Sequence, residues 1–164
     1  MENMPNHPDE KFMLSAIEEA KRSAVLGQYA LGAIVVDVDG NILSEEHTTT
    51  HAENDATAHA EVNAIRAACK KLNNRYLDGC WLYTTLEPCP MCTAAAIWAK
   101  MGGIVFGATK EDAINFAKQL KNEKFTWRQI DVSAREIVAK GDPKIGLVEG
   151  FMREECKPLF EFSE

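Results

Sequence analysis

The 164-residue chain has no long apolar run, no signal-peptide pattern in its first residues and an odd number of cysteines. No segment approaches the roughly 20 consecutive apolar residues that a membrane-spanning helix needs, so we expect no membrane partner. The first ten residues do not show the basic and then apolar pattern of a signal peptide. Five cysteines in a chain without such a leader argue against a disulfide framework. These absences predict a cytoplasmic protein.

Positive charge is also scarce, because 18 Lys and Arg residues stand against 25 Asp and Glu residues, for a net charge of -7. Binding to nucleic acids draws much of its strength from Lys and Arg side chains that neutralise phosphates. The densest basic groups, Lys70-Lys71 and the lysines of segment 118–124, are typical of the solvated faces of helices. The sequence therefore favours a small-molecule partner over a nucleic acid.

The chain contains no internal repeat, low-complexity tract or linker, and 46% of its residues are hydrophobic. Its length suits one domain with an ordinary core, so we predict a single domain over residues 1–164.

Hydrophobic periodicity and turn signals divide the chain into alternating elements. Helices are expected over residues 9–26, 59–72, 90–99, 110–120, 132–140 and 151–162. Strands are expected over residues 32–38, from 41 to 43, and over 81–86, 104–107 and 145–148. Segment 45–55 is polar and without periodicity, so it is expected to be a loop. This order predicts a three-layer α/β domain.

Two short segments carry the chemistry: His59-Ala60-Glu61, and the run from Pro88 to Cys92 that contains Cys89. A zinc ion held by His59, Cys89 and Cys92 would keep one tetrahedral position open, where a water becomes a nucleophile at neutral pH. Both groups fall at the start of an expected helix, which lowers thiol pKa values and favours the thiolate that zinc binds. Glu61 is not needed as a ligand and can carry protons.

Other interpretations of these residues exist. A lone C-x-x-C pair also occurs in thioredoxin-like redox sites, and half of a structural zinc ribbon would look similar, although the sequence has no second C-x-x-C. Neither alternative accounts for Glu61. The combination H-x-E followed by P-C-x-x-C is the signature of zinc-dependent nucleobase deaminases, and the chain matches it. We therefore expect a single zinc ion per chain.

Residues 30–110 resemble the cytidine deaminase superfamily, in its branch of guanine, cytosine and tRNA adenosine deaminases. The matching segments are 55–62 (DATAHAEV), 82–92 (LYTTLEPCPMC) and 104–108 (IVFGA). Segment 125–131 (FTWRQID) is similar, more weakly, to bacterial guanine deaminases. The resemblance implies an α-β-α sandwich with a central five-stranded mixed sheet, and commonly a homodimer.

The resemblance also implies roles for single residues. Glu61 would take a proton from the zinc-activated water and pass it to the substrate ring and then to the departing amine. The backbone N–H of Ala60 corresponds to a family position that contacts the base. Thr48 stands where family members usually have a substrate-contacting asparagine, and Leu31 where guanine deaminases tend to place an aromatic residue. These two departures put guanine itself in doubt.

The neighbouring histidines His47 and His51 are open to three interpretations: solvent-facing loop residues, substrate contacts or spare ligands. For the whole chain we expect a zinc-dependent deaminase that releases ammonia from a free nucleobase or nucleoside, an aminated purine or pyrimidine. The alternatives are a tRNA-specific adenosine deaminase and, from another class, a structural zinc module without activity.

Overall fold

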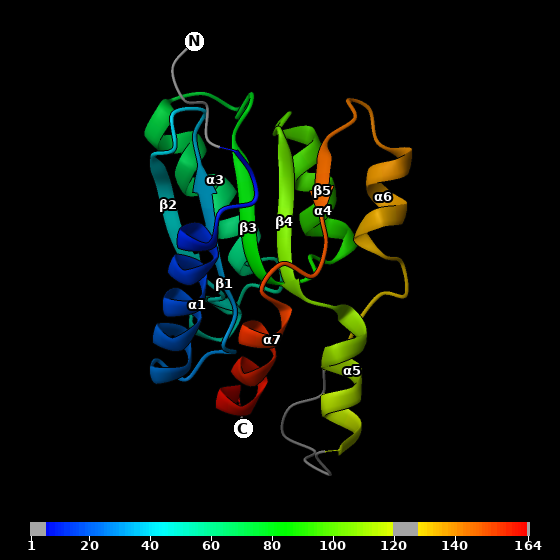
Figure 1. The fold of residues 1–164 in the computed structure, drawn as a ribbon. Helices are drawn as coiled ribbons and strands as arrows, with labels where there is room; N and C mark the ends of the chain where they lie inside the picture. The colour runs from blue at the N-terminus through cyan, green and yellow to red at the C-terminus, as the bar shows by residue number, and fades with distance from the viewer. Residues whose placement is uncertain (1–5, 120–127, 164) are drawn as a thin grey trace.

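The computed structural model describes residues 6–119 and 128–163 (Figure 1). The strands are β1 (Gly32–Val36), β2 (Ile42–His47), β3 (Trp81–Leu86), β4 (Gly103–Ala108) and β5 (Gly146–Val148). The α-helices are α1 (Glu10–Val25), α2 (Thr50–Glu53), α3 (Ala60–Leu72), α4 (Pro90–Trp98), α5 (Lys110–Gln119), α6 (Ala134–Lys140) and α7 (Arg153–Cys156). A 3-10 helix, η1 (Lys157–Ser163), follows α7.

The strands form one sheet in the order β2-β1-β3-β4-β5. β1 pairs antiparallel with both β2 and β3, whereas β3, β4 and β5 are parallel to one another. Parallel neighbours need a crossover, and α4 joins β3 to β4 in this way. The predicted five-stranded mixed sheet is confirmed.

Helices cover both faces of the sheet, so the predicted three-layer sandwich is also confirmed (Figure 1). Successive side chains of a strand point to opposite faces. In β1, Ile34 and Val36 pack with α1 and η1, while Ala33 and Val35 pack with α3 and α4. α1 lies so close to β1 that a methyl group at Gly32 would overlap the backbone of Ala16.

Segment 45–55, expected to be a loop, is instead part strand and part helix. β2 continues to His47, which pairs with Gly32 of β1, and the short helix α2 follows. The prediction failed because β2 is an edge strand of the sheet, and edge strands commonly carry polar side chains. Its polar composition therefore hid a real strand.

The C-terminal α-helix expected over 151–162 was also wrong in type. Only Arg153–Cys156 is α-helical, and the chain then continues as the 3-10 helix η1. Pro158 lacks the N–H that an α-helix would use at this position, which explains the change. The buried side chains of Leu159 and Phe160 still pack against the α1 face of the sheet, so the apolar pattern was meaningful.

The parallel strands β3 and β4 place the functional residues. The chain leaves both strands at the same edge of the sheet, where the backbone N–H of Glu87 donates to the carbonyl of Ala108 at 2.8 Å. This edge, at the carboxyl ends of parallel strands, is where α/β proteins commonly bind ligands. No helix within residues 6–119 and 128–163 is long and apolar enough to cross a bilayer.

Candidate metal centre and active site

Two helix N-termini bring the predicted metal ligands together. His59 is the N-cap residue of α3, and Cys89 is the N-cap residue of α4. Pro90 occupies the first turn of α4, where its missing N–H costs no hydrogen bond, and Cys92 lies one turn further along. Residues 30 positions apart in the sequence therefore meet because their two helices start at the same place.

The three ligand atoms are spaced as a tetrahedral zinc site requires. His59 Nδ1 lies 3.6 Å from Cys89 Sγ and 3.5 Å from Cys92 Sγ, and the two sulfurs are 3.6 Å apart. With zinc bonds of ~2.3 Å to sulfur and ~2.0 Å to nitrogen, a tetrahedron separates the sulfurs by about 3.8 Å and sulfur from nitrogen by about 3.5 Å. The donor set thus fits zinc. In the described parts of the chain this is the one His, Cys, Asp and Glu cluster with such convergence.

The electrostatics of the two thiols agree with a metal centre. Hydrogen bonding from Cys92 lowers the pKa of Cys89 to about 4, and the same interaction, together with burial, raises the pKa of Cys92. Zinc binds thiolates, and its positive charge would offset the cost of burying them.

Glu61 lies in the first turn of α3, and its side chain is only 5% exposed. The hydroxyl of Thr84, on β3, donates to Glu61 Oε1 at 2.8 Å. Burial raises the pKa of the Glu61 carboxyl, while hydrogen bonds with Cys92 and Thr84 lower it in part. The structure thus holds a buried carboxyl group in a fixed orientation beside the metal ligands.

A cavity of about 410 Å³ opens over these residues, and His59, Glu61 and Cys89 line it. We call six further lining residues, each exposed or half-buried, the cavity rim: Tyr29, His51, Lys110, Arg128, Gln129 and Ile130. The volume lies within the range of sites that enclose a small ligand.

The residues predicted to contact the substrate differ in whether they line the cavity. Thr48 and Leu31 both line the cavity, and the buried Thr48 hydroxyl donates to the carbonyl of Ala58 at 3.3 Å. Ala60 is buried as the first residue of α3 and is not part of the cavity lining. Any contact that Ala60 makes with a substrate must come from its backbone.

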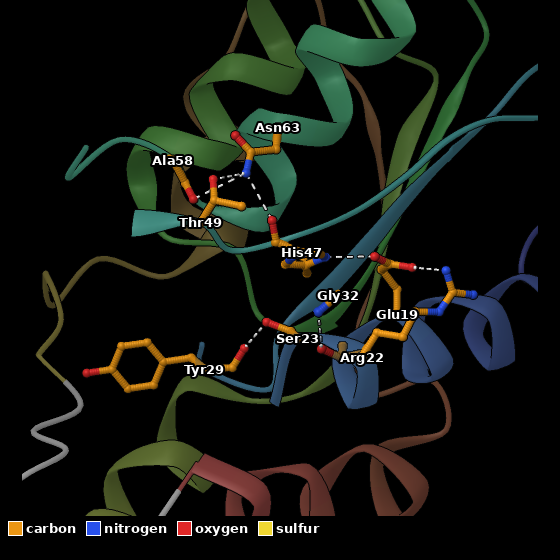
Figure 2. A network of polar contacts seen from close by, with 10 residues as sticks. Glu19, Arg22, Ser23, Tyr29, Gly32, His47, Thr49, Ala58 and Asn63 are labelled. Carbon is orange, nitrogen blue, oxygen red and sulfur yellow. Dashed lines mark hydrogen bonds and ion pairs between the residues drawn. The ribbon is translucent and has the colours of Figure 1, made fainter. Parts of the chain in front are cut away.

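The two histidines before α3 have different environments. His47 Nδ1 lies 2.7 Å from Glu19 Oε1, a buried carboxylate of α1 that also pairs with Arg22 (Figure 2). His51 lies at the cavity rim, where its ring is 5.5 Å from that of Tyr29. Neither belongs to the metal cluster, so the interpretation as spare ligands is not supported.

Sequence reasoning missed several residues that shape the cavity. Asn63, one turn after His59, donates to the carbonyl of His47 and to Thr49 Oγ1, both at 2.9 Å, and so fixes the backbone on either side of Thr48 (Figure 2). Tyr29, Lys110 and Arg128 come from separate segments without a local motif. Glu87 accepts hydrogen bonds from the backbone N–H groups of Lys110 and Ala134, both at 3.1 Å.

Comparisons with known proteins agree with this site. A tRNA-specific adenosine deaminase of Aquifex aeolicus is 44% identical over 99 residues, which are 60% of this chain and 65% of that protein. Guanine deaminase of Bacillus subtilis is 44% identical over 105 residues, 64% of this chain and 65% of that protein. The matched region thus spans slightly less than two thirds of either relative.

Solved structures of related deaminases have a similar fold. A structure from a study of A-to-I editing by tRNA:A34 deaminases superposes with a TM-score of 0.75 at 28% identity, covering 92% of this chain and 99% of that one. The family model of the cytidine and deoxycytidylate deaminase zinc-binding region matches residues 6–108, which include every residue of the metal centre. The chain therefore belongs to the cytidine and deoxycytidylate deaminase zinc-binding family.

Proposed function

We propose that the protein is a zinc-dependent hydrolytic deaminase that releases ammonia from an aminated purine or pyrimidine ring. The observation that carries the proposal is the buried carboxyl group of Glu61, which lies beside a three-ligand zinc site at the bottom of a cavity. A structural zinc site is closed by four protein ligands and needs no carboxyl group nearby. Three ligands and a free carboxyl group are the composition of a hydrolytic centre.

Different residues would bind the metal, transfer protons and position the proton-transferring group. His59, Cys89 and Cys92 hold zinc, which when bound supplies a Lewis acid that activates a water for attack. Glu61 would accept a proton from the attacking water and give it to a ring nitrogen. It would then take the proton of the hydroxyl group formed on the carbon and deliver it to the departing amine, which leaves the carbonyl. Thr84 orients Glu61 through its 2.8 Å hydrogen bond. Water and the amino group are thus exchanged for a carbonyl oxygen and ammonia.

Two substrate classes have support. Adenosine in tRNA is supported by the Aquifex relative and by the solved structure from work on tRNA:A34 deaminases. A free base or nucleoside is supported by the equally similar guanine deaminase and by the net charge of -7. Adenosine in tRNA has more support among the relatives than a free base or nucleoside has. The relatives therefore argue against the expectation from the sequence that the protein has no nucleic-acid partner.

Three further properties are proposed from the same observations. We propose that residues 1–164 act as one deaminase domain, that the protein is cytoplasmic, and that it forms a homodimer. One candidate contact for such a dimer is the large apolar side chain of Trp98, the last residue of α4, which is 81% exposed. Sedimentation of the parent protein and of Trp98→Lys tests it, because a dimer built on this residue would dissociate.

Ammonia release from a panel of substrates tests the activity. The panel contains guanine, guanosine, cytosine, cytidine, adenine, adenosine, aminated triazines and pterins, and an RNA anticodon stem-loop with adenosine in its loop. We expect ammonia from at least one member, and Glu61→Gln should keep its zinc while turnover falls about 100-fold to 10,000-fold. A zinc-loaded parent protein that releases ammonia from none of them would instead support a structural zinc module.

A further inference from the structure

Four residues of one segment line the same cavity as Glu61: Thr48, Thr50, His51 and Ala56. We call residues 48–57 the wall segment. We propose that Asn63, which lies outside the cavity lining, is a positioning residue that holds the two ends of the wall segment together and so sets how tightly the site binds its substrate. This inference rests on the proposed deaminase function and adds a residue that acts on substrate binding through other residues.

The wall segment has little apolar anchorage of its own. Within this described stretch of the chain, no residue from 49 to 57 is buried. Its one helix, α2, has four residues, which is too short for a helix to be stable by itself. Apolar burial stabilises most of the fold, but here it contributes little. The position of the wall segment therefore depends on hydrogen bonds.

The carboxamide of Asn63 supplies hydrogen bonds to both ends of the wall segment (Figure 2). Its Nδ2 donates at 2.9 Å to the carbonyl of His47, the residue before the segment, and at 2.9 Å to Thr49 Oγ1. The same atom lies 3.4 Å from the carbonyl oxygen of Ala58, the residue after the segment. The backbone N–H of Thr49 also donates to this carbonyl, at 3.0 Å. One side chain thus joins the start of the wall segment to its end.

The helix that carries Asn63 also carries groups of the metal centre. His59 is the N-cap residue of α3, and Glu61 lies in its first turn. The backbone N–H of Asn63 donates to the carbonyl of His59 at 2.9 Å. Residues of one helix keep their relative positions, so Asn63 ties the wall segment to the same rigid element as His59 and Glu61. Loss of this tie would shift the wall while the metal ligands and Glu61 stay in place.

Asn63→Leu tests the inference, because it keeps a branched side chain of similar size and removes both N–H donors. Steady-state kinetics with a substrate from the panel above should show KM rising about tenfold, with kcat changed by less than about twofold. The zinc content should stay the same. Asn63→Gln keeps the carboxamide one methylene further out, so it should restore part of the loss in KM.

Hydrogen exchange of the zinc-loaded proteins gives a second measurement that needs no activity. We expect peptides from the wall segment to exchange about tenfold faster in Asn63→Leu than in the parent, because fewer hydrogen bonds oppose local opening. Peptides from β3 should exchange at the parent rate. Faster exchange in β3 as well would mean that Asn63 supports the whole domain, and it would overturn the specific role.

Asn41→Leu is the matched control. Its Nδ2 donates to Asp37 Oδ2 at 3.1 Å, in the turn between β1 and β2 and outside this cavity. It makes the same chemical change and should alter neither KM nor exchange in the wall segment.

An unchanged KM in Asn63→Leu, or an equal rise in Asn41→Leu, would overturn the positioning role and leave the proposed deaminase function standing. A fall in kcat as large as the rise in KM would also overturn it. A zinc-loaded parent protein that deaminates nothing would overturn the function and, with it, the role in substrate binding. Hydrogen exchange would then still decide whether Asn63 holds the wall segment.

Discussion

The two ends of the cavity differ in how the chain builds them. The metal end consists of His59, Glu61, Cys89 and Cys92, which come from two short segments at the starts of α3 and α4. The cavity rim takes its six residues from four separate segments, and four of the six residues lie outside regular elements. Positions fixed on helices are more precise than positions on loops, whereas loops vary more readily. Under the proposed function, we therefore expect the metal end to carry the reaction chemistry and the rim to govern substrate choice.

Removing a ligand should give the largest effect, because it breaks the metal end itself. We expect Cys92→Ala to lose both its zinc and all measurable ammonia release, since two ligands bind zinc far more weakly than three. Metal analysis of the purified protein measures the first loss. Cys69→Ala is the control, because Cys69 is a partly buried cysteine that lies outside the metal cluster. Retention of zinc in Cys92→Ala would contradict the assigned ligand set.

A smaller effect is expected from the residue that orients Glu61. Thr84→Val keeps the shape of the side chain but removes the hydroxyl that donates to Glu61 Oε1. We expect turnover to fall about tenfold with zinc content unchanged, because one hydrogen bond to a charged group is lost. Steady-state kinetics and metal analysis together measure this.

Thr85→Val is a matched control for Thr84→Val. Thr85 is buried in the same strand, but its hydroxyl accepts from the backbone N–H of Gly32 at 3.3 Å and does not contact Glu61. It should lose some stability and little turnover. An equal loss of turnover in both variants would mean that Thr84 acts through the packing of β3 and not through Glu61.

Changes at the rim should alter substrate affinity and leave the chemical step alone. Tyr29→Ala removes one ring of the pair that Tyr29 forms with His51. We expect KM to rise about threefold to tenfold, because stacking of the substrate ring on Tyr29 would contribute about 1 kcal/mol to binding. The value of kcat and the zinc content should change little. Tyr76→Ala, a tyrosine outside the cavity lining, should change neither constant. A large fall in kcat for Tyr29→Ala would contradict the expectation that rim residues affect substrate binding and not the chemical step.

The smallest effect on activity is expected at the contact that anchors α5, the helix that begins with Lys110. Arg153 of α7 donates from Nε and Nη2 to the two carboxylate oxygens of Asp112, at 2.8 and 2.7 Å. This hydrogen bonding holds the pKa of Asp112 well below its ordinary value of 3.8. A depressed pKa stabilises the folded state above the ordinary value, and the contribution is lost as the pH falls below it.

We therefore expect Asp112→Asn to lower the free energy of unfolding by about 1 kcal/mol at pH 7 and by less at pH 3. Urea denaturation of parent and variant at each pH measures the difference, in which the shared contribution of zinc cancels. Glu149→Gln breaks the exposed pair with Arg135 and should cost less at pH 7. A cost for Asp112→Asn that grows toward acid pH would contradict the assigned direction of the shift.

The two elements that differ from the prediction do so for the same physical reason. The polar segment that became the end of β2 was missed because an edge strand needs little apolar surface. The C-terminal helix was assigned from an apolar pattern that a 3-10 helix can also present, and only Pro158 signalled the difference. In both places the local pattern was weak and tertiary pairing or packing decided the backbone. The strongly periodic elements, such as α1 and β3, were predicted almost to their ends.

The sequence by itself determined the metal end, because three ligands and a carboxyl group lie within two short segments whose spacing leaves few geometries. Their place at helix N-termini follows from local signals, such as Pro90 in the first turn of α4. Only the tertiary structure decided the rim, the link from Thr84 to Glu61 and the fixing of Thr48 by Asn63. These contacts join segments far apart in the chain, and pairing of this kind depends on the sheet order, which no short stretch of sequence encodes.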